Sequence, residues 1–275
     1  MNEMWQALAR EAGLAAEHIA IGATALGKAN YAQQAYYAQA FFALSIGFER
    51  AAKLALVVDH ALNHSGSFPQ PNTLRDYGHA LNKLLERTDE LAKQRGLTVI
   101  DERLPRTVIH EGIIKVLSDF ASNVTRYYNL DLITGDPRAA KHDDPVRAWF
   151  DLVIVPILAA HFRPHHRSKR EQNARLIEVL LADSALVRQH SERGEALDTI
   201  YEASMHTGVT EFARPYARMY VMQIARFLGR FLSELGYAAY KARLDTVPYL
   251  SEFFVIFNNS DEYFRRRRVW SIYRL

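Results

Sequence analysis

Apolar residues recur every three or four positions along most of the chain. Between about residues 30 and 64 these positions follow one stripe: Tyr37, Phe41, Leu44, Phe48, Ala51, Ala55, Val58 and Leu62. This spacing places side chains on one face of an α-helix, which can then be buried against neighbours. Similar patterns predict helices over about 72–95 and 105–131. The sequence therefore predicts an all-α fold, a helical bundle with additional C-terminal helices.

Two segments are typical of loops. SGSFPQPN at 65–72 and TGDPRAAKHDDP at 134–145 combine glycine, proline and small polar residues. Beyond the second loop we expect helices at 145–162 (bent at Pro156), 168–192, 194–206, 214–242, 248–257 and 260–273. No segment alternates strictly between apolar and polar, so almost no sheet is expected. We divide the chain into a bundle over 1–135 and a helical region over 136–275, packed together as one body.

Composition and charge narrow the class of protein. The 275 residues include no cysteine, which excludes disulfides and cysteine-ligated metals and fits a reducing cytoplasm. The net charge of +3 and pI near 9.0 permit a nucleic-acid partner. No apolar stretch is long enough to span a membrane, so we expect a cytoplasmic protein without a membrane partner.

The histidines of HFRPHHR at 161–167 stand beside arginines, which favours a solvated turn over a metal site. We expect no metal and no cofactor.

A polar line interrupts the apolar helix that ends in SDFASNVTRYYNLD. Its members are spaced three or four apart: Asp119, Asn123, Arg126 and Asn129. Tyr127 and Tyr128 follow the arginine, so its guanidinium is expected in partly dry surroundings, where it needs a fixed partner. Two interpretations stay open: an arginine that ties helix to helix, or a residue that holds an anion in a groove.

Four consecutive arginines, Arg265, Arg266, Arg267 and Arg268, stand near the end of the chain. Such a run can bind the phosphates of a nucleic acid, and Trp270 and Tyr273 can stack on bases. The alternative is structural: cations near the negative end of a helix dipole, paired with nearby acids.

Three segments together resemble a HEPN domain, the "higher eukaryotes and prokaryotes nucleotide-binding" family. They are FFALSIGFERAAKLALVVDHALNHSG with Gly-x-Glu-Arg-x-x-Lys, then the Tyr-Gly-His-x-Leu-x-x-Leu helix, then the helix ending SDFASNVTRYYNLD. The resemblance covers about residues 30–135. It implies a helical bundle, a homodimer, a role in bacterial defence or toxin systems and, in many members, metal-independent endoribonuclease activity.

The nucleases of that family carry an arginine followed by a histidine about four to six residues later. Here no histidine follows Arg126 within reach, which leaves two hypotheses. In an endoribonuclease, Arg126 would stabilise charge on a phosphate, Asn129 would orient the scissile group, and His79 or a partner chain's histidine would move protons. Alternatively, a non-catalytic module binds nucleic acid, a nucleotide or a protein. We expect Arg126 and Asn129 to face a groove between the 30–64 and 72–95 helices, with His79 on the same wall.

Overall fold

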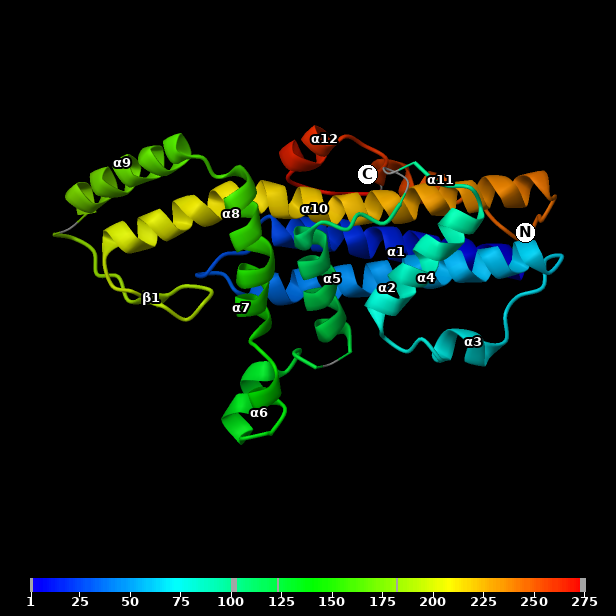
Figure 1. The fold of residues 1–275 in the computed structure, drawn as a ribbon, viewed down its shortest axis with the longest axis horizontal. Coiled ribbons are helices and arrows are strands. Elements are labelled where there is room, and N and C mark those ends of the chain that lie inside the picture. Colours follow the sequence, from blue (N-terminus) through cyan, green and yellow to red (C-terminus); the bar gives the residue numbers. More distant parts are fainter. Residues whose placement is uncertain (1, 100–102, 123, 182, 273–275) are drawn as a thin grey trace.

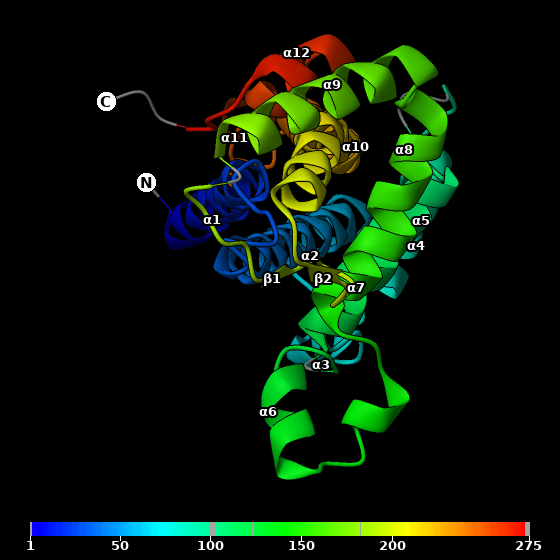
Figure 2. The same ribbon diagram turned by 90° about the vertical axis from the view of Figure 1, so that its left-hand side faces the viewer.

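Three long helices form the frame of the molecule. The computed structural model describes residues 2–99, 103–122, 124–181 and 183–272. The frame helices lie lengthwise beside one another (Figures 1 and 2): α1 (Glu3–Leu26), α2 (Ala35–Asn63) and α10 (Ile200–Lys241). Asn2 caps α1, and Thr199 and Glu202 form a capping box at the start of α10. The all-α class predicted from the sequence is confirmed.

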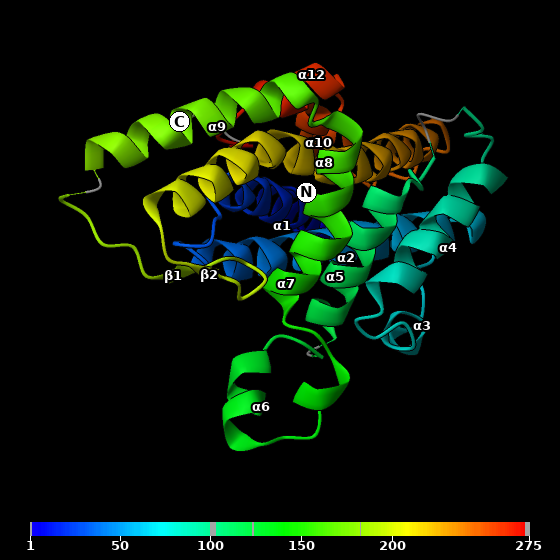
Figure 3. The ribbon, with the colours of Figure 1, turned by 60° about the vertical axis from the view of Figure 1, so that its left-hand side comes forward.

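Shorter helices cover this frame on several sides. The helices α4 (Leu81–Gln94) and α5 (Val108–Ala121) pack on α2. A bent segment crosses the long helices, and α9 (Pro164–Leu181) lies along the first half of α10 (Figure 3). The bent segment comprises α7 (Pro145–Trp149), a π-helical turn (Phe150–Ile154) and α8 (Val155–His161). Near the C-terminus follow α11 (Ser251–Phe254), a 3₁₀ turn (Val255–Phe257) and α12 (Asp261–Arg266).

The remaining elements are small. The helix α3 (Pro71–Arg75) precedes α4, while α6 (Tyr128–Thr134) and a 3₁₀ turn (Ala139–Lys141) project from the body (Figure 2). Two short strands, β1 (Gln189–His190) and β2 (Ala196–Leu197), pair antiparallel, with Gln189 opposite Leu197.

One hydrophobic core joins the two halves of the chain. Phe41 of α2 lies with its ring centroid 5.8 Å from that of Phe120 and 5.2 Å from that of Trp149. All three side chains are buried, and the same core extends from Leu8 to Trp270. Among the described residues, no single helix is long and apolar enough to cross a membrane, although the bent pair 139–161 and 164–181 meets that test when taken together.

Two of the predicted helices in the first half are interrupted. The 72–95 segment forms α3 and α4, because residues 76–80 make a turn in which Gly78 adopts φ +52° and accepts a hydrogen bond from Lys53 Nζ. The 105–131 segment leaves the helix after Ala121, where the N–H of Val124 bonds to the carbonyl of Asp119, five residues earlier. Arg126 therefore lies between α5 and α6 rather than on a helix.

Several predicted helix limits in the second half are also wrong. Residues 189–197 form the hairpin, and the helical pattern of the expected 194–206 helix belongs to the first turns of α10. That helix continues past Pro215, so the expected break before 214 is absent. The final predicted helix, 260–273, ends at Arg266, after which the chain is extended. Two residues of the candidate chemistry, Asn123 and Tyr273, lie outside the described residues.

Candidate functional site

A cavity of about 720 Å³ lies where the end of α1 meets α10 and the segment that follows α12. We call it the basic cavity. Its walls carry six basic side chains and one acidic one: Lys28, Arg214, Arg218, Arg265, Arg266, Arg268 and Glu211. Like charges repel one another, so a cluster of six cations around one cavity is unfavourable unless something compensates the repulsion.

Arg218 is the buried cation of this group, with 3% of its surface exposed. Its Nε donates to the carbonyl of Phe264 at 3.2 Å and its Nη2 to the carbonyl of Arg265 at 2.7 Å. No carboxylate of the described residues lies within ion-pair distance. Burial, followed by repulsion from Arg268 and Arg214, lowers the pKa of the Arg218 guanidinium to about 10. The fold therefore holds this charge in place without neutralising it.

Two other cations of the cavity do have acidic partners. Arg214 Nη2 lies 3.2 Å from Glu211 Oε1, and Arg266 Nη2 lies 2.6 Å from Glu262 Oε1. Both acids are more than half exposed, so water and salt screen these pairs.

The other three cations have no carboxylate partner in the described chain. Arg265 lies over the ring of Tyr216, with its guanidinium carbon 5.4 Å from the ring centroid. Lys28 Nζ stands 5.6 Å from the ring centroid of Tyr36. Arg268 is exposed and makes no hydrogen bond or ion pair with the residues that the structure describes. With Arg218, four positive charges around the cavity have no acidic partner in the part of the chain that the structure describes.

Arg267 alone among the four consecutive arginines does not line the cavity. Its guanidinium lies over the rings of Tyr263 and Trp270, at 5.5 and 5.3 Å, and its Nε donates to the carbonyl of Val269. Since the chain is extended after Arg266, neighbouring side chains point to different sides. Three of the four arginines expected to bind nucleic acid therefore face one space, and the fourth packs against aromatic rings.

An aromatic surface lies beside the basic cavity. The rings of His161 and Tyr216 are stacked, with centroids 4.2 Å apart, and His161 Nε2 lies 2.9 Å from the hydroxyl of Tyr220. Burial, with smaller effects of Arg163 and Arg265, lowers the pKa of His161. The imidazole is therefore held neutral next to Arg265. The sequence alone favours a solvated turn for the segment that contains this histidine and does not indicate its contact with Tyr216 and Tyr220.

Arg126 and Asn129 line a second, smaller cavity of about 360 Å³. The Arg126 guanidinium lies between the rings of Phe42 and Phe120, at 5.2 and 5.4 Å from their centroids. Its Nε is buried without a hydrogen-bond partner. The two residues thus share a concave surface, as expected, but its walls come from α2, α6 and the start of α7 rather than from the 72–95 segment.

His79 lies apart from that pair. It lines a third cavity, of about 860 Å³, and its Nδ1 is 3.1 Å from Glu49 Oε2. Lys53 Nζ donates to Glu49 Oε1 and to the carbonyl of Gly78, both at 2.8 Å. The expectation that His79 shares a wall with Arg126 is therefore wrong, because the turn at 76–80 holds the histidine beside Glu49 of α2, in a different cavity.

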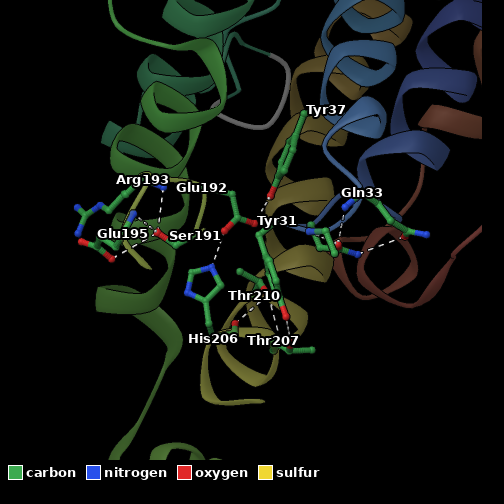
Figure 4. Close-up of polar contacts among 12 residues, drawn as sticks. Tyr31, Gln33, Tyr37, Ser191, Glu192, Arg193, Glu195, His206, Thr207 and Thr210 are labelled. Atoms are coloured by element: carbon green, nitrogen blue, oxygen red, sulfur yellow. Dashed lines mark hydrogen bonds and ion pairs between the residues drawn. The ribbon is translucent and has the colours of Figure 1, made fainter. Parts of the chain in front are cut away.

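A buried polar cluster escaped sequence inspection (Figure 4). Glu192, in the hairpin, has a fully buried side chain and accepts hydrogen bonds from the Tyr37 hydroxyl at 3.1 Å and His206 Nε2 at 2.5 Å. Burial and then the charge of Glu192 raise the pKa of Tyr37. The cluster fastens the hairpin to α2 and α10. Gly194 is typical of a hairpin turn and could have indicated the hairpin. The helical spacing of the surrounding apolar residues instead predicts helices on both sides of it.

No protein-family model, curated protein or solved structure matches the chain. The resemblance to HEPN domains therefore rests on the sequence motifs quoted above. Within the described ranges, no group of three or more histidine, aspartate or glutamate side chains is placed to hold a metal ion.

Proposed function

We propose that the protein is a helical module that binds RNA or a nucleotide through phosphate groups in the basic cavity. The buried guanidinium of Arg218 is the observation that carries this proposal. Burying a cation without a counter-charge is unfavourable, and three further cations without acids surround it. A phosphate in the cavity would supply the missing negative charge and accept charge-assisted hydrogen bonds from the arginines.

The positions of the other candidate residues favour binding over cleavage. A general base must lie within hydrogen-bond reach of the proton that it removes. Within one chain, Arg126 and Asn129 line one cavity and His79 another. Among the described residues, the basic cavity has one carboxylate, Glu211, and this is already paired with a cation. We therefore prefer the binding module to the endoribonuclease suggested by the HEPN resemblance.

Binding of fluorescently labelled single-stranded RNA and of a labelled nucleotide tests this function. We expect Arg265→Gln and Arg268→Gln each to weaken binding about tenfold, a typical loss for a charged hydrogen bond. Arg167→Gln is the matched control, since Arg167 is exposed on α9 and pairs with Glu171. Equal affinities for all four proteins, or no binding of either probe, would contradict the proposal.

Incubating the labelled RNA with the protein in the presence of a metal chelator, and then separating the RNA on a gel, distinguishes a ribonuclease from a binding module. RNA that is shortened by the native protein and by Arg268→Gln, but not by Arg126→Gln, would favour cleavage at the Arg126 cavity. A second chain that supplies a histidine there would explain such a result. We expect the RNA to remain intact.

A further inference from the structure

The basic cavity has the size and charge of a site for a compact chain of phosphates. We propose that it binds a linear triphosphate, the group shared by nucleoside triphosphates, 5′-triphosphate RNA ends and inorganic tripolyphosphate. This inference rests on the proposed function and names the chemical group that the basic cavity recognises.

The dimensions of the cavity are the first argument. Its volume of about 720 Å³ falls within the roughly 300–1,000 Å³ of pockets that enclose small molecules. Proteins that hold a single strand instead use a groove that follows the backbone for about 4–16 nucleotides. The cations here line one compact cavity instead of a long groove. Neighbouring phosphates of a single short chain therefore match their positions better than the spaced phosphates of a strand.

The charges are the second argument. Lys28, Arg218, Arg265 and Arg268 have no acidic partner among the described residues, which leaves four positive charges. A terminal phosphate carries about two negative charges near neutral pH and each bridging phosphate one. The triphosphate of a nucleoside or of an RNA end therefore carries about four, and tripolyphosphate, with two terminal phosphates, about five. A single phosphodiester supplies one. A triphosphate therefore neutralises the cavity, whereas one nucleotide unit of an RNA strand does not.

The fixed position of Arg218 is the third argument. Two of its N–H groups are bonded to backbone carbonyls, which leaves three of the five guanidinium hydrogens for a ligand. Gly27 permits this placement, because a Cβ atom there would lie 2.8 Å from Arg218 Nη1. A guanidinium held by the backbone loses little conformational freedom when a ligand binds, which favours affinity.

Calorimetric titration with phosphate, pyrophosphate and tripolyphosphate in metal-free buffer tests the inference. We expect affinity to rise with each added phosphate, by about a hundredfold or more in total, because each step neutralises further cations. Tripolyphosphate should also raise the melting temperature of the protein, since a ligand that binds the folded state stabilises it. Equal affinity for phosphate and tripolyphosphate would overturn the inference.

Two neighbouring arginines provide a matched pair of variants. Arg268→Gln should weaken tripolyphosphate binding at least tenfold. Without ligand, its melting temperature should be unchanged or higher, because a charge that repels Arg218 is removed. Arg267→Gln should leave the affinity unchanged, since Arg267 packs on aromatic rings outside the cavity. Equal weakening by both variants would refute a specific site and indicate only general attraction of anions.

A backbone variant tests the shape of the site without removing a charge. Gly27→Ala keeps every cation, and the φ of −67° at Gly27 suits alanine. Its Cβ displaces the Arg218 guanidinium, so tripolyphosphate should bind at least tenfold more weakly to a protein that still unfolds cooperatively. Native affinity in this variant would show that Arg218 does not hold the triphosphate.

Competition experiments identify the source of the triphosphate. RNA with a 5′-triphosphate, RNA with a 5′-hydroxyl, ATP and tripolyphosphate would each be tested as competitors of a labelled nucleoside triphosphate. We expect the three triphosphates to compete at least tenfold better than 5′-hydroxyl RNA. If 5′-hydroxyl RNA binds and no triphosphate displaces it, the inference fails while the proposed function stands. If none of the four binds, both fail.

Discussion

The stability of the protein should fall between about pH 6.5 and pH 4 because of one buried histidine. His110, in the first turn of α5, is 2% exposed. Its Nε2 lies 2.8 Å from Gln223 Oε1, an acceptor, so Nε2 carries the hydrogen. Its Nδ1 then accepts from the Thr107 hydroxyl at 2.7 Å and from the Thr107 backbone N–H at 3.4 Å, and the second bond completes the capping box of α5. Protonation of Nδ1 would remove that acceptor and bury a charge.

The size of this effect follows from the pKa. Burial lowers the pKa of His110 from its ordinary value of 6.5 to about 4. The unfolded chain therefore takes up a proton first as the pH falls. Each unit of difference is about 1.4 kcal/mol, so His110 should remove about 3 kcal/mol of stability between pH 6.5 and pH 4, and none below. Above about pH 6.5 both states are neutral, and this contribution is constant.

Urea unfolding at several pH values, for the native protein and His110→Gln, isolates this contribution. Glutamine is a usual third helical residue of a capping box, so the variant keeps the cap while losing the titration. Other groups titrate alike in both proteins, and their effects cancel in the difference. We expect the native protein to lose about 3 kcal/mol more than the variant over this interval. Equal losses would refute the reasoning that a buried neutral His110 resists protonation.

Three further changes test other parts of the structure. Removing the buried acid with Glu192→Ala should cost about 3 kcal/mol in urea unfolding, whereas Glu195→Ala, at an exposed position of the same hairpin, should cost less than about 0.5; equal costs would contradict the buried cluster. Glu49 contacts both Lys53 and His79, so Glu49→Gln should destabilise the turn at 76–80 by about 1 kcal/mol, seen as faster amide exchange at Gly78. Unchanged exchange would show that Glu49 does not hold the turn in place. Arg126→Met keeps the length and packing of the side chain and should cost within about 1 kcal/mol in urea unfolding, because Arg126 has no ionic partner among the described residues; a loss above about 3 would indicate a structural ion pair.

Helix existence was predictable from the sequence, and helix ends were often not. The apolar stripe of the 30–64 segment, from Tyr37 to Val58, is buried in α2 as the spacing predicts. The break in the 72–95 segment depends on Lys53 and the carbonyl of Gly78, which are 25 residues apart. Such tertiary contacts leave no trace in local periodicity, which is why the broken helices and the hairpin were misassigned.

The candidate site was predictable in part, for a similar reason. Four consecutive arginines stand out in any sequence, and three of them line the basic cavity. Lys28 joins them from the turn that follows α1, and Arg218 from α10, a proximity that only the fold reveals. Arg218 did carry a signal, since it is a charged residue among the apolar positions that form the buried side of α10. A cation among buried apolar positions needs a fixed partner, as inferred for Arg126, and at position 218 such a cation is the buried arginine of the site.

The salt dependence of RNA binding tests most directly whether phosphates bind in the basic cavity. The logarithm of the binding constant of a labelled single-stranded RNA would be measured against the logarithm of salt concentration, for the native protein and Arg265→Gln/Arg268→Gln. Each phosphate contact on a single strand contributes about −0.7 to this slope. We expect the double variant to bind more weakly, with a slope shallower by about 1.4. Native affinity and an identical slope in the double variant would contradict a phosphate site at the basic cavity.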